Sequence, residues 1–177
     1  MIHIRNATNA DQSSIRAIHL QAFSAEENQR VALLAIDLLH EQTSPETFAF
    51  VAELDGAVVG HIALSPVAVS ADPDWQGYIL SPLGVLPEHQ KRGIGSKLIE
   101  HGIAQLEHIG TDAIFVYGDP AYYGKFGFRA DAALRYAPPY PLQYPFGWQA
   151  IMLNERDTGQ SPLTILCVVA LCDPELW

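Results

Sequence analysis

Two glycines, Gly93 and Gly95, stand where a helix is expected to begin, beside the cations Lys91, Arg92 and Lys97. The first amides of a helix lack intrahelical acceptors and point along a favourable dipole, so they bind phosphate groups well. A glycine at such a place lets a phosphate approach the backbone without a Cβ in the way. The segment therefore predicts a site for an anionic ligand that carries phosphate.

The spacing of these glycines departs from both common nucleotide-binding motifs. A Rossmann fingerprint requires a third glycine where this sequence has Leu98, and a Walker loop requires glycine, lysine and serine or threonine where it has Gly95, Ser96 and Lys97. A nucleotide-binding regulator is therefore disfavoured. For the glycine pair taken alone, a plain loop-to-helix turn stays open as an alternative.

Pro82 and Gly84 lie just upstream, inside what the hydrophobic pattern predicts to be a central strand. Proline removes a hydrogen-bond donor from a sheet and glycine weakens strand pairing, and a bulge would explain both residues. A strand that bulges away from its parallel neighbour frees backbone groups for an extended ligand. The same ligand could place its phosphates at the following helix start.

The elements around this segment form an α/β pattern. Helices are expected over residues 8–23, 24–42 and 92–110, and strands over residues 1–7, 47–54, 57–69, 76–86 and 112–118. The dipeptide Asp55–Gly56 predicts a hairpin turn, and the order strand, helix, strand over residues 76–118 predicts a parallel pair. A short helical turn running into another strand, a proline-aromatic loop and two final strands are expected over residues 119–128, 136–148, 148–153 and 163–171.

The segment "LGVLPEHQKRGIGSKLI" resembles the acyl-coenzyme A binding motif of the GNAT superfamily of N-acetyltransferases, Gln/Arg-x-x-Gly-x-Gly/Ala, with Gln90, Gly93 and Gly95 as the matching residues. The segment "GDPAYYGKFGF" resembles the signature of the YhbS-like branch. The resemblance implies a single GNAT domain over residues 1–177, with a mixed central sheet, splayed parallel central strands and helices on both faces. It covers residues 2–130 well, and residues 131–177 hold the loop and the last strands.

The resemblance also implies the ligand and its contacts. The co-substrate is acetyl-CoA, the pantetheine arm follows the strand at Leu83 and Val85, and Tyr123 lies near the thioester. The residues implied for the pyrophosphate end are Gln90, Lys91, Arg92, Gly93, Ile94, Gly95 and Ser96.

Acyl transfer to an amine needs a proton donor for the leaving thiolate and a donor for the developing oxyanion. A phenol is protonated at neutral pH, and the family's Tyr-x-x-x-Gly-Phe pattern indicates Tyr123, five residues before Phe128, as the general acid. Tyr122 is the competitor, and both rings could instead only pack under a helix. The backbone N–H of Val85 or a neighbour is the expected oxyanion donor.

The base that removes the amine proton is less well defined by the sequence. Glu27, with Glu26 beside it, comes at the start of the second helix, which borders the acceptor site in this family, although acidic residues are favoured in any first helical turn. His61 could face the cleft or be a packed strand histidine, and the second is favoured. Asp119 is expected to cap the short turn that carries Tyr122 and Tyr123. No metal ligands are indicated.

The proline-aromatic loop has two interpretations. Its aromatic residues could line a pocket for a cationic or planar acceptor, or they could tie the last strands to the core. These residues are Tyr136, Tyr140, Tyr144, Phe146 and Trp148. The segment "NERDTGQSP", residues 154–162, departs from what the YhbS-like branch leads us to expect and leaves acceptor specificity and a dimer contact open.

Charge and composition narrow the class of partner. Twenty Asp and Glu against ten Lys and Arg give a formal net charge of −10, which disfavours nucleic acid and anionic membranes and favours a cationic amine. Cys167 and Cys172 are expected to be buried small hydrophobes, in no motif suited to a nucleophile. Since the longest apolar run is far short of a membrane span, we expect a cytoplasmic protein, either a monomer or a homodimer.

Together these observations predict an acetyl-CoA-dependent N-acetyltransferase that acetylates a primary amine by direct attack in a ternary complex, without a covalent enzyme intermediate. A GNAT-fold module that binds an acyl-CoA without transferring the acyl group is the alternative from another functional class.

Overall fold

The computed structural model describes residues 1–157, 159 and 162–177. These residues fold into two compact units, which we describe separately. The first unit comprises Met1–Leu64 and Ser81–Ile103, and the second comprises Ser65–Leu80 and Ala104–Trp177. Three elements contribute residues to both units: strands β3 (Ala57–Val69) and β4 (Asp72–Val85) and helix α3 (Ile94–His108). A single domain over residues 1–177 stays a prediction.

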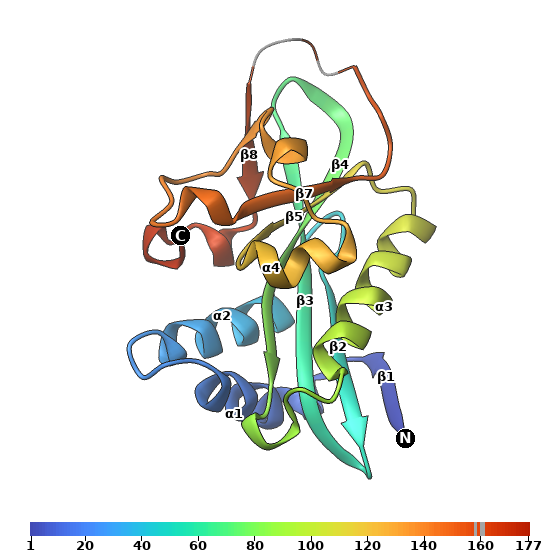
Figure 1. Ribbon diagram of the computed structural model, residues 1–177, viewed down its shortest axis with the longest axis vertical. Coiled ribbons are helices and arrows are strands. Elements are labelled where there is room, and N and C mark those ends of the chain that lie inside the picture. The colour runs from blue at the N-terminus through green and yellow to red at the C-terminus, as the bar shows by residue number, and fades with distance from the viewer. Residues whose placement is uncertain (158, 160–161) are drawn as a thin grey trace. The chain divides into compact units, whose positions relative to one another are not determined.

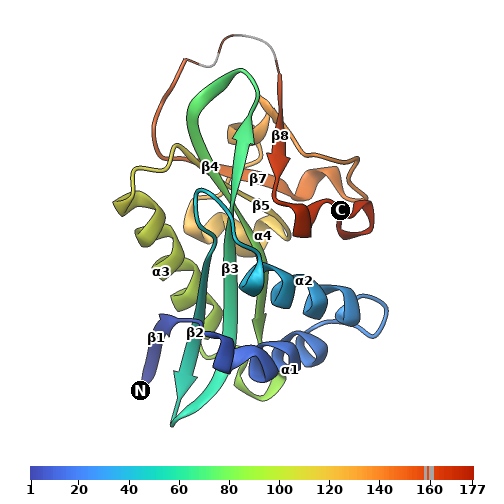
Figure 2. The same cartoon turned by 180° about the vertical axis from the view of Figure 1, so that it is seen from behind.

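The other helices and strands, most of which are labelled in Figures 1 and 2, each have all their residues in one unit. The first unit adds β1 (Ile2–Asn6), α1 (Gln12–Ala22), α2 (Asn28–His40) and β2 (Phe48–Leu54). The second unit adds β5 (Ala113–Tyr117), α4 (Pro120–Tyr123), β6 (Tyr136–Ala137), β7 (Trp148–Met152) and β8 (Leu163–Cys167).

Antiparallel pairing builds the sheet of the first unit. Strand β1 pairs with β2, and β2 pairs with β3 across the turn at Asp55 and Gly56, whose φ angles are 51° and 82°. Two consecutive positive φ values are the geometry of a tight hairpin turn, so the hairpin predicted from the Asp-Gly pair is confirmed. The Leu86 N–H, just beyond β4, donates to the Val59 carbonyl of β3 at 2.9 Å.

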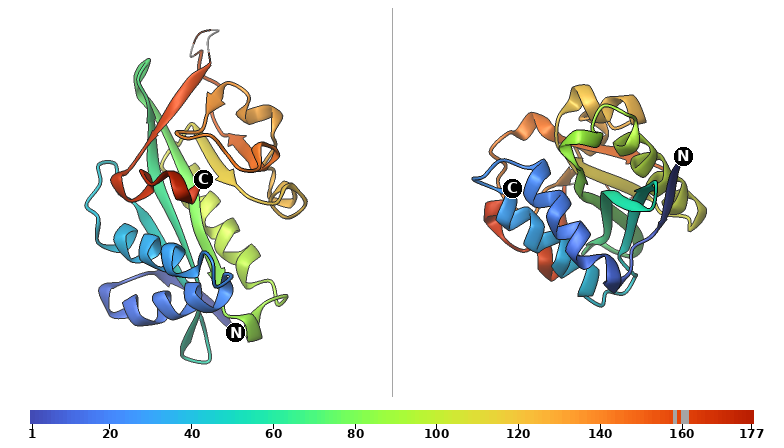
Figure 3. Two further views of the ribbon diagram at one scale, coloured as in Figure 1. Left: turned by 90° about the vertical axis from the view of Figure 1, so that its left-hand side faces the viewer. Right: turned by 90° about the horizontal axis from the view of Figure 1, so that it is seen from below.

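Helices cover both faces of this sheet, and two consecutive residues of β3 show how. A Cβ at Gly60 would lie 3.0 Å from Ile94 of α3, whereas the next residue, His61, hydrogen-bonds to His19 of α1. Successive strand residues point to opposite faces, so α1 and α3 lie on opposite faces of the sheet (Figure 3).

The predicted apolar faces of the helices form the core of the first unit. Ile15 of α1, Ala35 of α2 and Val51 of β2 form one fully buried cluster. Helix α3 ends at His108, and Gly110 stops it as predicted, because Gly110 has a φ of 78° and donates its N–H to the Glu107 carbonyl.

The second unit contains the predicted parallel pair. Strands β4 and β5 pair in parallel from Gly77↔Ala113 to Ile79↔Phe115, and β5 pairs antiparallel with β7. Strand β8 pairs antiparallel with β3 and in parallel with β6. The mixed α/β sheet with flanking helices expected from the sequence is therefore confirmed.

Two expectations for the second unit were wrong. The strand expected after the short helical turn is reduced, within the described residues, to an isolated bridge between Arg129 and Ala150. The segment expected to be only a loop contains the short strand β6, because Tyr136 and Ala137 find partners in β8. Among the helices described here, none is long and apolar enough to cross a membrane.

Candidate functional site

The segment from Gln90 into α3 has the backbone geometry of an anion-binding loop. Lys91 and Gly93 both have positive φ angles, of 60° and 77°. The Lys97 N–H donates to the Gly93 carbonyl at 3.0 Å and is thus the first amide bonded within the helix, which leaves the amides of Ile94, Gly95 and Ser96 ahead of it. Left-handed turns that lead into free helix amides form the concave arrangement of N–H groups that binds anions.

Exposure and charge around this loop suit a phosphate ligand. Lys91, Arg92, Gly93 and Lys97 are all exposed, so their cations and backbone are accessible. A Cβ at Gly93 would meet no atom of the described chain within 4 Å, so its open side can receive a ligand. Glycine is needed there because of its φ angle.

The side chain of Gln90 connects the start of the loop to the preceding strand. Its side-chain amide donates to the Val85 carbonyl at 3.0 Å, at the end of β4. The motif's glutamine therefore ties the anion-binding loop to the strand that precedes it.

The last residues of β4 alternate as a strand should. Leu83 and Val85, the residues implied for the pantetheine arm, are half-buried, and Pro82 and Gly84 are buried. A Cβ at Gly84 would lie 2.8 Å from the His19 Nδ1 atom and 3.0 Å from Ile18. Close packing against α1 thus requires glycine at position 84, a reason that the predicted bulge did not include.

Glu27 lies at the N-cap of α2, and its side chain and that of Glu26 are exposed. The Glu27 carbonyl accepts the Val31 N–H at 3.0 Å, so the backbone of Glu27 starts the helix. The structure places this carboxylate in the first unit, as a surface group.

His61 is fully buried, as the packed-histidine interpretation predicted, and it has a partner that the sequence analysis missed. The Nδ1 atom of His61 lies 2.9 Å from the Nε2 atom of His19, which is also fully buried. Burial lowers the pKa of His19 to about 4 and holds that of His61 well below its usual range, with a further lowering from His19. His19 lies one helical turn after Ile15, a spacing that could have indicated its burial.

Tyr123 belongs to the second unit, where it ends α4. Asp119 caps that helix as predicted, by accepting the Ala121 N–H at 2.9 Å. The Tyr123 ring packs against the backbone of Gly118, where a Cβ would lie 2.5 Å from the ring, and against Phe128 at a centroid distance of 5.8 Å. Burial, and next the neighbouring Tyr122, raise the pKa of Tyr123 above its usual range.

Tyr122 has different surroundings. Its ring contacts Phe126 at 5.6 Å, and the Lys125 ammonium lies 5.9 Å from its centroid. The two tyrosine rings also contact each other edge to face at a centroid distance of 5.1 Å, so they share one aromatic cluster and differ in their other neighbours.

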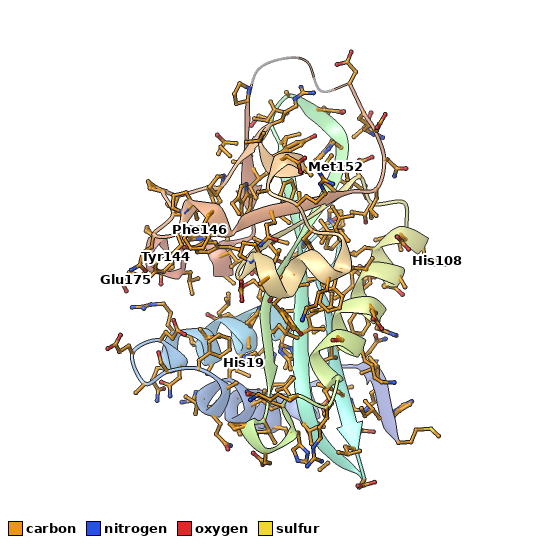
Figure 4. All side chains as sticks on the ribbon, in the orientation of Figure 1. His19, His108, Tyr144, Phe146, Met152 and Glu175 are labelled. Carbon is orange, nitrogen blue, oxygen red and sulfur yellow. The ribbon has the colours of Figure 1, made fainter. Side chains whose placement is uncertain are left out.

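The aromatic residues of the proline-aromatic loop fit different interpretations. Trp148 and Tyr136 are buried, and the Trp148 indole donates to the Tyr136 carbonyl at 2.7 Å, so these two tie the strands together. Tyr144 and Phe146 are 53% and 67% exposed, with ring centroids 5.9 Å apart (Figure 4). Tyr140 is half-buried, with its ring centroid 6.4 Å from that of Trp177. An acceptor-binding role stays a prediction for Tyr140, Tyr144 and Phe146.

The cysteines also differ from each other. Cys167 is half-buried on β8, and burial raises its pKa to about 12, so its thiol stays protonated at neutral pH. Cys172 is exposed, and its prediction as a buried hydrophobe was wrong, because the apolar run ends in a short helical turn after β8. The segment 154–162, which differs from what the YhbS-like branch leads us to expect, includes residues 158, 160 and 161, which lie outside the described residues.

Comparison with known proteins identifies the class to which this fold and this loop belong. The model of the acetyltransferase (GNAT) family matches residues 13–128. YjhQ of Escherichia coli K12, named an uncharacterized N-acetyltransferase, is 32% identical over 168 residues, which are 94% of this chain and 90% of YjhQ. The chain belongs to the GNAT family of acetyltransferases.

Two solved structures resemble the chain over nearly its whole length. YhbS of Escherichia coli, in complex with CoA, has a TM-score of 0.80 and 26% identity, covering 96% of this chain and 91% of its own. A GNAT acetyltransferase of Brucella melitensis, in complex with acetyl-CoA, has a TM-score of 0.73 and 31% identity. The match covers 96% of this chain and 97% of the Brucella chain. The predicted family, its fold and the likeness to YhbS are confirmed.

Proposed function

We propose that this chain is an N-acetyltransferase that uses acetyl-CoA to acetylate a primary amine by direct attack in a ternary complex. The observation that carries the proposal is the loop before α3, where left-handed Lys91 and Gly93 lead into three helix-start amides that precede the first intrahelical bond. The CoA and acetyl-CoA bound to the two similar structures support the same ligand class.

The first unit would hold the donor. The backbone N–H groups of the loop and the cations Lys91 and Arg92 bind the pyrophosphate, and the backbone of Leu83 and Val85 bonds the pantetheine amides. A Val85 N–H directed at the thioester oxygen would stabilise the oxyanion as the amine attacks.

Tyr123 would supply the proton for the leaving group. As the amine nitrogen bonds to the acetyl carbon, the C–S bond breaks, its electron pair goes to sulfur, and the phenol O–H protonates the thiolate. A raised pKa keeps this phenol protonated at neutral pH, so the proton is present when it is needed.

Two further parts of the proposal concern the acceptor. Glu27 is a candidate base for the amine proton, and its exposure makes it accessible to an acceptor. The net charge of −10 favours a cationic amine, either a small molecule or a protein side chain.

The test combines ligand binding with turnover. Acetyl-CoA is expected to raise the unfolding temperature of the protein, whereas ATP and NAD are expected to leave it unchanged. CoA release is then measured with a panel of cationic, neutral and acidic amines, and the cationic ones are expected to react fastest. Protection by acetyl-CoA without CoA release from any amine would instead identify a binding module, and protection by ATP or NAD alone would overturn the ligand class.

A further inference from the structure

Strand β7 carries a buried side-chain amide that no step of the proposed function uses. Gln149 is 1% exposed and lies opposite Val116 of β5, one residue pair before the end of the ladder between the two strands (β5 and β7 are labelled in Figure 1). Its Nε2 atom donates to the Gly118 carbonyl at 3.1 Å and to the Gly147 carbonyl at 3.2 Å. Because a primary amide has two N–H groups, both of its donors are used on these two carbonyls.

The backbone of Gly118 is held on both of its sides. Its N–H donates to the Gly147 carbonyl at 3.0 Å, and its carbonyl accepts the Gln149 amide. The Gly118 carbonyl and the Asp119 N–H belong to one planar peptide group, so a hydrogen bond to the carbonyl fixes the whole plane. Gln149 therefore sets the orientation of the peptide that leads into Asp119, the N-cap of α4.

Tyr123 depends on this peptide through its backbone and through its ring. The Asp119 carbonyl accepts the Tyr123 N–H at 3.0 Å, so the first turn of α4 starts from the peptide that Gln149 holds. The ring packs on Gly118 itself, where a Cβ would lie 2.5 Å from the ring. All of these residues belong to the second unit.

An apolar residue could fill the position of Gln149 more simply. Burial of a side-chain amide is unfavourable unless its donors are bonded, and ordering a long side chain loses rotamer freedom. What glutamine adds at this place is the pair of hydrogen bonds, and these act on the turn that precedes α4.

We propose that Gln149 is a positioning residue for Tyr123, an inference that rests on the proposed acetyltransferase function and on the acid role of Tyr123 within it. By fixing the Gly118 peptide, Gln149 holds the phenol where it protonates the leaving thiolate. Gln149 acts through Gly118 and exchanges no proton itself. Misplacing a catalytic group by about 1 Å can lower turnover by up to about 100-fold, so the hydrogen bonds behind the turn affect the reaction rate.

The central variant is Gln149→Met, which keeps an unbranched side chain of similar length but has no N–H to donate. We expect kcat to fall about 10-fold, because the Gly118 peptide loses one of its two anchors. The KM for acetyl-CoA should stay within about twofold of wild type. The residues proposed for the pyrophosphate and the pantetheine arm belong to the first unit, so the variant removes none of those contacts.

Asn154→Leu is the matched control. The Asn154 side-chain amide also donates to two backbone carbonyls of the second unit, those of Thr111 at 3.0 Å and Gly110 at 3.4 Å. Its loss should lower the unfolding temperature and leave kcat unchanged, because neither carbonyl leads to Tyr123.

A double-variant cycle separates positioning from general stabilisation. If Gln149 acts through Tyr123, Gln149→Met should cost no further turnover once the phenol is gone. Gln149→Met/Tyr123→Phe should therefore have a kcat within about twofold of Tyr123→Phe. A second loss of about 10-fold in the double variant would overturn the proposal.

A spectroscopic measurement follows the tyrosine directly. In protein with 13C-labelled tyrosine, the ring signal of Tyr123 is identified because Tyr123→Phe removes it. This signal should shift in Gln149→Met and stay in place in Asn154→Leu. A Tyr123 signal that Gln149→Met leaves unshifted would count against the proposal.

Gly147→Ala displaces the same carbonyl without altering Gln149, and it provides the test if Gln149→Met does not fold. A Cβ at Gly147 would lie 2.9 Å from the Gly118 carbonyl oxygen, so the Gly118 peptide must shift. The kcat should again fall about 10-fold at an unchanged KM for acetyl-CoA, with no further loss in the Tyr123→Phe background. A folded Gly147→Ala protein with the wild-type kcat would contradict the proposal.

The outcomes also separate this inference from the function on which it rests. If the wild type releases CoA and Gln149→Met does so equally fast, Gln149 has no positioning role while the acetyltransferase stands. If Tyr123→Phe turns over like the wild type, the acid role fails and the inference fails with it. If the wild type releases no CoA with any amine, the proposed function itself fails.

Discussion

Tyr122 and Tyr123 are adjacent in the chain, both are half-buried and their rings contact each other at a centroid distance of 5.1 Å, but their other neighbours differ. Tyr123 is enclosed between Gly118 and Phe128, and burial raises its pKa. Tyr122 contacts Phe126 and the Lys125 ammonium. Contacts on two sides of the Tyr123 ring limit its motion, which suits the proton-donor role that we propose for it.

We expect Tyr123→Phe to lower kcat about 100-fold while the affinity for acetyl-CoA stays within about twofold, because only the proton donor is removed. CoA release under saturating acetyl-CoA, together with calorimetric titration of acetyl-CoA, measures the two quantities. Tyr122→Phe is the matched comparison and should keep most of its turnover. Equal turnover of Tyr123→Phe and wild type would remove Tyr123 from the mechanism.

The individual residues could be predicted only where a motif or a turn defines them. Asp119 was identified as a cap because a carboxylate before Pro120 is a local signal, and the structure confirms it. His19 was missed because its importance depends on His61, 42 residues away, and on Gly84 of another strand. Contacts of this range arise from tertiary packing and leave no local pattern.

At the scale of the element, α3 has a left-handed glycine at each end. Gly93 and Gly110 have φ angles of 77° and 78°, and a Cβ at either would meet no described atom within 4 Å. A residue with a Cβ therefore pays the same backbone cost at either place. The two glycines differ in where they lie, since Gly93 comes before the helix-start amides and Gly110 follows the end of the helix.

Gly93→Ala and Gly110→Ala should each destabilise the protein by about 1 kcal/mol, the cost of a left-handed backbone for a residue with a Cβ. Only Gly93→Ala should weaken acetyl-CoA binding, because the altered backbone carries the amides that bind phosphate. Urea unfolding and acetyl-CoA titration of both variants give the comparison. Equal acetyl-CoA affinity of the two variants would contradict the loop's assigned role.

The elements were predicted well wherever the hydrophobic period was long or the turn chemistry specific. The βαβ unit through α3 and the hairpin at Asp55 and Gly56 are both confirmed. The errors fall after Phe128, where pairing depends on distant partners: the backbone of Arg129 forms an isolated bridge with Ala150, and Tyr136 pairs with Leu163. Two-residue strands of this kind have no period to detect.

At the scale of the whole molecule, the two buried histidines make folding stability depend on pH. Their pKa values are lowered in the folded state, to about 4 for His19 and well below the usual value for His61, so the unfolded chain binds more protons as the pH falls below about 6.5. Their contribution to stability is therefore complete above that pH and is lost as the pH falls. Asp11 adds a separate loss at lower pH, because its hydrogen bond to Arg5 lowers its pKa.

We expect the free energy of unfolding to fall between pH 6.5 and pH 4 with a slope approaching about 2.7 kcal/mol per pH unit, the limit for two protons. His19→Gln should reduce this slope by about half, and His40→Gln should leave it unchanged. Urea unfolding at pH 7, 6 and 5 measures the slope. A stability that is constant over this range would show that the pair is protonated in the folded protein.

Gly118 restricts which sequences can keep the tyrosine. A Cβ at position 118 would lie 2.5 Å from the Tyr123 ring, and one at Gly147 would lie 2.9 Å from the Gly118 carbonyl. Positions 118 and 123 can therefore not diverge independently, whereas a Cβ at position 147 would meet a backbone carbonyl that any residue at position 118 carries. In related chains we expect a larger residue at position 118 to be accompanied by loss of the aromatic ring at position 123, so that these two positions are inherited as a pair.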